Sequence, residues 1–193
     1  MAITKGSTSG VYGQKYISML AGNAPFAPTD FDSIATFVAT GSETGVTFSS
    51  IPATYTHLQI RLNTSTARYN SFSLICNGDT TANYSVHGMY RRENSTGGAF
   101  GVLAQTYYYL SYAANTPLTY PWVGLVDILE YTNTSKWKTM RTLCGGINNT
   151  TDGYNAVEQN SGMWQSLAAV NSITISGPTI NSGSTISLYG IKG

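Results

Sequence analysis

Few side chains in this 193-residue chain could carry acid–base or nucleophilic chemistry. It contains two histidines, His57 and His87, and nine carboxylates. A hydrolase needs a base placed beside a nucleophile or an activated water, and neither histidine has a companion at metal-ligand spacing. The sequence has no Gly-x-Ser-x-Gly elbow and no phosphate-binding glycine loop. We therefore predict a protein without catalytic residues, metal or cofactor.

Carboxylates could still pair as the acid and nucleophile of a glycosidase. The candidate pairs are Asp127 with Glu130, and Asp79 with Asp152. Asp127 and Glu130 stand three residues apart, so on an extended strand they face opposite sides. The run Asn148-Asn149-Thr-Thr-Asp152-Gly153 comes closest to a calcium loop, but it is more typical of a turn. A glycosidase is therefore the weakest alternative.

The composition excludes several classes of function. Charged residues make up only 10% of the chain, and the formal net charge is +1, which argues against a nucleic-acid partner. The polar residues are mainly 26 Thr, 21 Ser and 14 Asn. No segment approaches the about 20 apolar residues of a membrane span, and no secretory signal opens the chain. We expect synthesis in a cytosol, no membrane partner, and Cys76 and Cys144 as free buried thiols.

Short alternating segments predict strands. In Tyr55-Thr-His-Leu-Gln-Ile-Arg-Leu62, Leu58, Ile60 and Leu62 point to one side. Ser71-Phe-Ser-Leu-Ile-Cys76 repeats the pattern and ends in Asn77-Gly78-Asp79, a turn sequence that tolerates positive φ. Further candidate strands are 34–40, 45–50, 84–90, 99–113, 119–131, 136–144, 156–168, 171–176 and 184–192. Around Asp127–Tyr131 one helical turn is conceivable.

This pattern predicts an all-β, antiparallel two-sheet sandwich over residues 32–193. A jelly roll is the favoured topology, and immunoglobulin-like or lectin-like sandwiches stay open.

The first residues differ from the rest. Residues 1–31 are rich in Gly, Ser, Thr and Pro, so they predict an extended N-terminal arm; a disordered tail is the alternative. The apolar residues of this arm cannot bury one another, and we expect them to anchor the chain to a partner. They are Tyr12, Tyr16, Ile17, Leu20 and Phe26.

Tyrosine is unusually frequent, with 14 residues. Tyr107, Tyr108 and Tyr109 are consecutive, so a strand must place them on both faces, and we expect Tyr108 or its neighbours at a surface. Tyr69 and Tyr154 lie in polar connections and could stack on sugar rings. Tyr69, Tyr108 and Tyr154 are therefore the candidate recognition residues. Cross-strand aromatic pairing and plain hydrated turns are the alternatives.

The longest polar connections are 63–70, 93–98 and 145–154. Loops gather at the two poles of a sandwich, and an outward pole is where another surface would be met. The basic run Lys136, Lys138 and Arg141, beside Trp137, is interpreted as a solvated face rather than as a partner site.

Several segments of residues 32–193 are specific enough to compare with known families. The most specific are Ser187-Leu-Tyr-Gly-Ile-Lys192 and Lys136-Trp-Lys-Thr-Met-Arg141; Gly162-Met-Trp-Gln-Ser166 adds to them. These segments resemble small β-sandwich structural proteins of tailed-bacteriophage virions, of the capsid-decoration or tail-fibre type. The resemblance implies a virion component with no catalytic residues.

We accordingly expect a non-enzymatic protein on the exterior of a phage particle, either decorating the capsid or belonging to a tail fibre or tail tip. Its partners would be other virion proteins and further copies of itself, as a homotrimer or another cyclic oligomer. The alternative is a carbohydrate-binding module that attaches to a host surface glycan.

Overall fold

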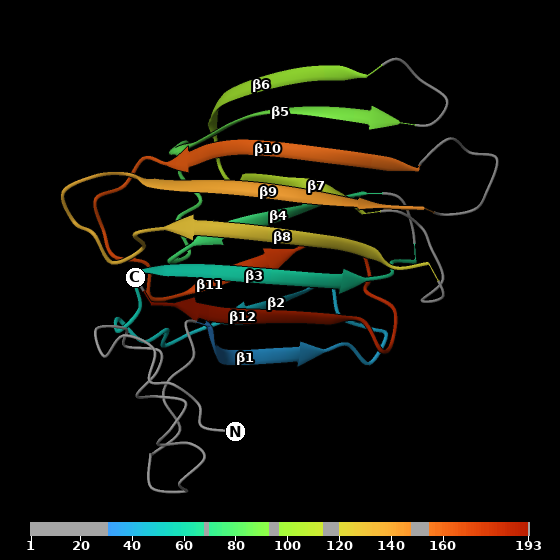
Figure 1. Ribbon diagram of the computed structural model, residues 1–193, viewed down its shortest axis with the longest axis horizontal. Helices are drawn as coiled ribbons and strands as arrows, with labels where there is room; N and C mark the ends of the chain where they lie inside the picture. Colours follow the sequence, from blue (N-terminus) through green and yellow to red (C-terminus); the bar gives the residue numbers. More distant parts are fainter. Residues whose placement is uncertain (1–30, 68–69, 93–96, 114–119, 148–154, 193) are drawn as a thin grey trace, which may run out of the picture.

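The computed structural model describes residues 31–67, 70–92, 97–113, 120–147 and 155–192, which form two antiparallel sheets and no helix (Figure 1). The larger sheet has the order β1-β12-β3-β8-β9-β10-β5-β6, and the smaller one β2-β11-β4-β7. The strands are β1 (Phe31–Val38), β2 (Gly45–Phe48), β3 (His57–Thr64), β4 (Asn70–Cys76), β5 (Tyr84–Arg92), β6 (Gly98–Gln105), β7 (Tyr108–Ala113), β8 (Trp122–Leu129), β9 (Lys138–Gly146), β10 (Ala156–Trp164), β11 (Ile173–Ser176) and β12 (Thr185–Ile191). The prediction of an all-β two-sheet sandwich is confirmed.

Three local predictions need correction. The segment 99–113 is two strands, because the chain leaves β6 at Gln105 and enters β7 in the other sheet at Tyr108. No helical turn forms near Asp127, since β8 continues to Leu129 and Glu130 then adopts a φ of 47° in a turn. Phe31, assigned to the arm, is the first residue of β1, whereas residues 1–30 lie outside the described residues.

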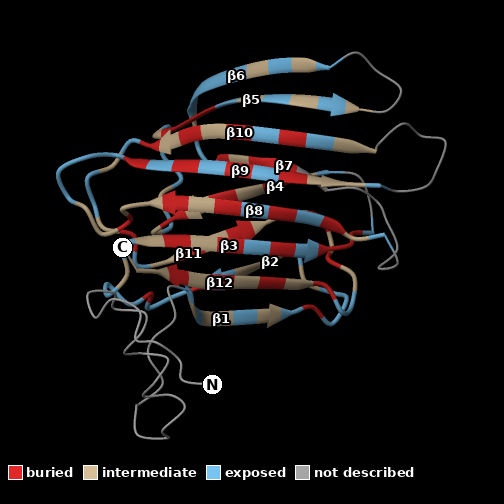
Figure 2. Cartoon of the chain, in the orientation of Figure 1, coloured by how far each residue is buried: buried red, intermediate tan, exposed pale blue. Residues whose placement is uncertain are grey.

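The core lies between the two sheets. Leu58, Ile60 and Leu62 of β3 are buried, as their alternation predicts. Leu74 of β4 and Ile175 of β11 belong to the same cluster and come from the smaller sheet. Burying such a side chain contributes about 1.5–3 kcal/mol. Figure 2 shows the resulting alternation of buried and exposed residues along β8 and β9.

The predicted turn after β4 is confirmed. Asn77 and Gly78 have φ values of 52° and 67°, and Asp79 N donates to Cys76 O at 2.9 Å, which is a type I′ turn. The Asn77 side chain then donates to Ala169 O and accepts from Asn171 N. A local turn sequence therefore also holds the connection that leads into β11.

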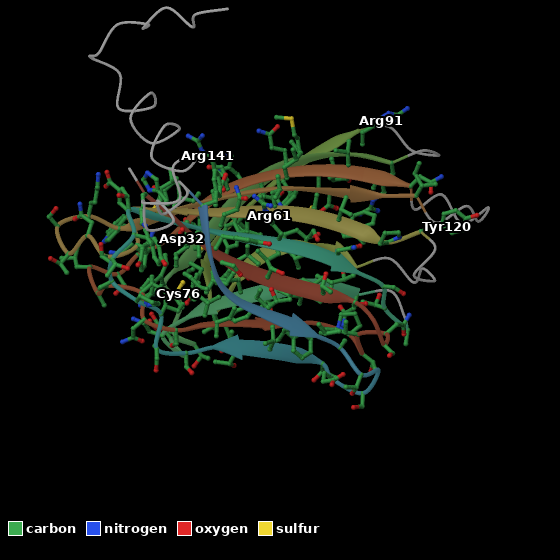
Figure 3. The ribbon with its side chains drawn as sticks, turned by 60° about the horizontal axis from the view of Figure 1, so that its bottom comes forward. Asp32, Arg61, Cys76, Arg91, Tyr120 and Arg141 are labelled. Atoms are coloured by element: carbon green, nitrogen blue, oxygen red, sulfur yellow. The ribbon has the colours of Figure 1, made fainter. Side chains whose placement is uncertain are left out.

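Several strands of the larger sheet begin or end side by side at the same end of the sandwich. Thr64 is opposite Trp122, and Ala156 is opposite both Gly146 and Arg92. β3, β5 and β9 therefore end, and β6, β8 and β10 begin, at this end of the sandwich, which we call the loop pole. Phe31 and Ile191 lie opposite each other at the other end, the terminal pole (Figure 1). In Figure 3, Arg91 and Tyr120 mark the loop pole, and Cys76 lies near the terminal pole.

Both cysteines are free and buried, as predicted. Burial raises the pKa of each thiol to about 12, so both stay protonated at neutral pH and are poor nucleophiles.

A carboxylate holds the terminal pole together. Asp79 accepts hydrogen bonds from Trp164 Nε1 at 2.7 Å, from Asn83 Nδ2 at 3.0 Å and from both the backbone and the hydroxyl of Thr81. Desolvation opposes the charged form, but the hydrogen bonds outweigh it and keep the pKa of Asp79 well below its usual range. The turn after β4 is thereby connected to the end of β10.

Asp79→Ala should lower the free energy of unfolding by about 1–3 kcal/mol at neutral pH, because buried Trp164 Nε1 loses its acceptor. The folded-state pKa is depressed, so this stabilisation is complete above the unfolded pKa of about 4 and is lost as the pH falls through the folded value. Urea unfolding at a series of pH values from neutral downward should show that the difference in unfolding free energy between wild type and variant shrinks below about pH 4.

Asp127→Ala is the matched control, because Asp127 accepts one side-chain hydrogen bond, from Gln59, on the outer face of the sheet. If Asp79→Ala lowers the free energy of unfolding by no more than Asp127→Ala does, the role assigned to Asp79 is wrong.

Candidate binding cleft

The two sheets differ in width, and this leaves part of the larger sheet without a partner layer. β7 is the edge strand of the smaller sheet and packs against β9, β10 and β5. β5 and β6 extend beyond it (Figure 1). The inner face of this overhang and the edge at β7 enclose a cleft.

This overhang cleft has a volume of about 400 Å³, within the range of about 300–1,000 Å³ typical of ligand sites. Four aromatic rings, two charged groups, one amide and one aliphatic side chain line it. They are Tyr90, Arg92, Phe100, Val102, Gln105, Tyr107, Tyr109 and Glu158.

The register of β5 with its neighbours positions one wall of the cleft. Tyr90 is opposite Glu158 on β10 and Gly98 on β6. A Cβ at Gly98 would lie 2.7 Å from the Tyr90 ring, so the glycine lets this ring lie across β6. Arg92 follows on the same side of β5 and places its guanidinium carbon 4.7 Å from the centre of the Tyr90 ring. The wall therefore carries a ring and a cation in contact.

The floor of the cleft combines a carboxylate with two rings. Glu158 is buried and accepts a hydrogen bond from the Tyr109 hydroxyl at 3.2 Å. The Tyr109 ring meets Phe100 edge-on, with centroids 5.5 Å apart at 87°. Because a buried carboxylate needs hydrogen-bond donors, this contact fixes both side chains. An acceptor group is thus held in a defined orientation below aromatic walls.

The prediction that Tyr108 is a surface residue is wrong. Tyr108 is fully buried, its hydroxyl lies 3.3 Å from Thr142 Oγ1, and burial raises its pKa to about 12. Gly162 makes room for it, since a Cβ there would lie 2.8 Å from the Tyr108 ring. The exposed tyrosines of this run are its neighbours: Tyr107 is 37% exposed and half-buried Tyr109 also borders the cleft.

Other predicted positions lie outside the described residues. They comprise the candidate recognition residues Tyr69 and Tyr154, and the arm residues Tyr12, Tyr16, Ile17, Leu20 and Phe26. Asp152 and the calcium-like run 148–153 lie outside them too.

The remaining acid–base candidates take part in local structure. Glu130 pairs with Lys136, which lowers the pKa of the carboxyl, and its backbone N–H donates to His57 Nδ1 at 2.9 Å. Asp127 instead lies on the outer face of β8 and accepts from Gln59. The structure thus gives each side chain of this candidate pair a different partner.

The basic run needs one correction. Lys138 is buried, and its Nζ donates to the carbonyls of Asn133 and Lys136. Desolvation lowers its pKa. The interpretation as a solvated face is therefore wrong for Lys138, which opens β9 on the inner side, whereas Trp137 and Arg141 are exposed.

The sequence reasoning missed Tyr90, Arg92, Phe100 and Glu158. One signal was available, since Tyr90 and Arg92 alternate at the end of a candidate strand and so share a face. The signal for Glu158 was absent, because it meets Tyr90 only through pairing between distant segments.

In the part of the chain that the structure describes, no helix is long and apolar enough to cross a membrane. Among the same residues, no three His, Cys, Asp or Glu side chains lie close enough together to hold a metal ion. Comparison with protein-family models, curated proteins and solved structures found no match for the chain.

The two neighbouring tyrosines should respond very differently to truncation. Tyr108→Ala should cost about 3–5 kcal/mol of unfolding free energy, because it removes a fully buried ring. Tyr107→Ala should cost less than about 1 kcal/mol. Chemical denaturation of both variants measures these free energies. Equal losses of unfolding free energy would contradict the assignment of Tyr108 as buried and Tyr107 as exposed.

Proposed function

We propose that the protein is a non-enzymatic structural component of the exterior of a tailed-bacteriophage particle, held in place through its N-terminal residues 1–31. The observation that carries this proposal is an exposed apolar surface on the outer face of the larger sheet. The resemblance of residues 32–193 to virion structural proteins supports the assignment to a bacteriophage particle.

This outer patch consists of Val123, Leu125, Leu143 and Val157, on the neighbouring strands β8, β9 and β10. Their exposed fractions lie between 41% and 53%. Register places Leu125 opposite Leu143, and Gly145 opposite both Val123 and Val157. The patch contains a hollow of about 490 Å³. Contiguous exposed apolar side chains on a sheet indicate a surface that another protein covers.

Phe31, the first described residue, is connected to this patch through Arg61. Arg61 lines the hollow, and its guanidinium carbon lies 4.5 Å from the Tyr189 ring centre and 5.6 Å from that of Phe31. Phe31 therefore lies where the outer face and the terminal pole meet. Attachment on this side would leave the loop pole facing outward.

The strand order supports a viral building block. The sheets contain the strand orders β1-β12-β3-β8 and β2-β11-β4-β7. We propose that these eight strands form a jelly-roll core, to which β5–β6 and β9–β10 are added as two hairpins. Viral capsid and lectin domains use this fold. The partners would be other virion proteins and further copies in a cyclic oligomer; the lectin-like alternative is treated with the cleft below.

Leu143→Asp should reduce incorporation into particles at least about tenfold, because an aspartate would be buried at the contact without a partner. The residue is half exposed, so thermal unfolding should stay near that of wild type. Quantitative mass spectrometry of purified particles measures the occupancy. Leu103→Asp, at an exposed position of β6 outside the patch, is the matched control, and equal occupancy of the two variants would contradict the role of the patch.

Deleting residues 2–30 keeps every described residue and should leave a sandwich that unfolds cooperatively but no longer joins the particle. The same mass spectrometry provides the readout, and the copy number of wild type separates a capsid position from a tail position. Incorporation of the truncated protein at wild-type occupancy would show that the arm is not the anchor.

A further inference from the structure

We propose that the overhang cleft binds a neutral oligosaccharide, with sugar rings stacked on its tyrosines and hydroxyls bonded to Glu158. The inference does not rest on the proposed virion function, because it concerns the inner face of β5, β6 and β10 and needs no particle.

The aromatic walls supply the stacking surfaces. Four rings line one cleft: Tyr90 of β5, Phe100 of β6, Tyr109 of β7, and Tyr107 from the connection between β6 and β7. Rigid aromatic rings offer apolar area at little entropic cost, and a tyrosine adds a polar edge. The C–H-rich faces of a pyranose ring match such surfaces.

The polar groups match hydroxyls. The Glu158 carboxylate can only accept hydrogen bonds, whereas the Arg92 guanidinium can only donate them. Gln105 adds an amide, whose nitrogen donates to Leu103 O at 2.9 Å. A sugar carries neighbouring hydroxyls that both donate and accept, so it can satisfy acceptor and donor walls together.

A cationic ligand is disfavoured. Aromatic rings beside a carboxylate can also bind quaternary ammonium groups. Here the Arg92 guanidinium already lies over the Tyr90 ring, and Arg92 itself lines the cleft. A second cation would meet like charge, while a neutral ligand would not.

The residues that line the cleft are spread along the strands. Arg92 ends β5 at the loop pole, and Gln105 and Tyr107 lie at the opposite end, where Gln105 pairs with Tyr84. The rings and polar groups are thus spread along a cleft of about 400 Å³, and we infer a short oligosaccharide segment rather than a single sugar.

The test uses the full-length protein on an array of bacterial surface polysaccharides, followed by calorimetry with short oligosaccharides of the glycan bound. Wild type should bind saturably. Tyr90→Ala and Tyr107→Ala should each weaken binding about tenfold, the loss of one stacking contact, and Tyr107→Phe should restore most of the affinity. Glu158→Gln, which keeps the shape of the side chain, should weaken binding too.

Met89→Ala is the matched control, because Met89 precedes Tyr90 on β5 but is exposed on the opposite face. It should bind like wild type. The proposal is overturned by no saturable binding to any glycan, by equal binding of Tyr90→Ala and Met89→Ala, or by tetramethylammonium displacing the bound sugar. Particle incorporation is measured separately, so either proposal can fail alone.

Discussion

An antiparallel sheet with apolar side chains on one face must cover that face, and here eight strands meet only four. Where the sheets overlap, the interior is aliphatic, as at Leu58, Ile60 and Leu74. Toward the uncovered side the inner face changes to Thr142, Asn160 and Glu158, which are buried but polar. β7 covers these three side chains, and each lies within hydrogen-bond distance of a β7 group: Thr142 of the Tyr108 hydroxyl, Asn160 of Leu110 O and Glu158 of the Tyr109 hydroxyl. Side chains with hydrogen-bonding groups therefore replace aliphatic ones. The unequal widths of the sheets thus produce both the core and the cleft.

The sequence predicts the fold class because its signals are local. Alternation over β3 specifies which side chains are buried, and Asn77-Gly78 specifies a tight turn, without knowledge of any partner strand. Local patterns fail at 99–113. Apolar residues continue through the segment, but the chain passes from one sheet to the other between Gln105 and Tyr108. Short strands separated by two residues look like one long strand when only periodicity is considered.

The cleft depends on contacts that periodicity does not contain. Glu158 and Tyr90 meet through long-range pairing, and Tyr108 faces inward because Gly162 leaves space for its ring. The pairing of β7 with β4 also shifts register between Phe72 and Ser73, so strict alternation is broken along β7. The tyrosine run correctly predicted that one of its members is exposed, and this member is Tyr107. Which tyrosine that is depends on a glycine more than fifty residues away.

The outer patch and the cleft lie on opposite faces of the same strand. Val157 belongs to the patch and Glu158 to the cleft, and consecutive residues of β10 point to opposite sides of the sheet. A protein that covers Val157 therefore does not occlude Glu158. Assembly through the outer face and ligand binding at the inner face can occur together, because the two surfaces lie on opposite faces of one sheet.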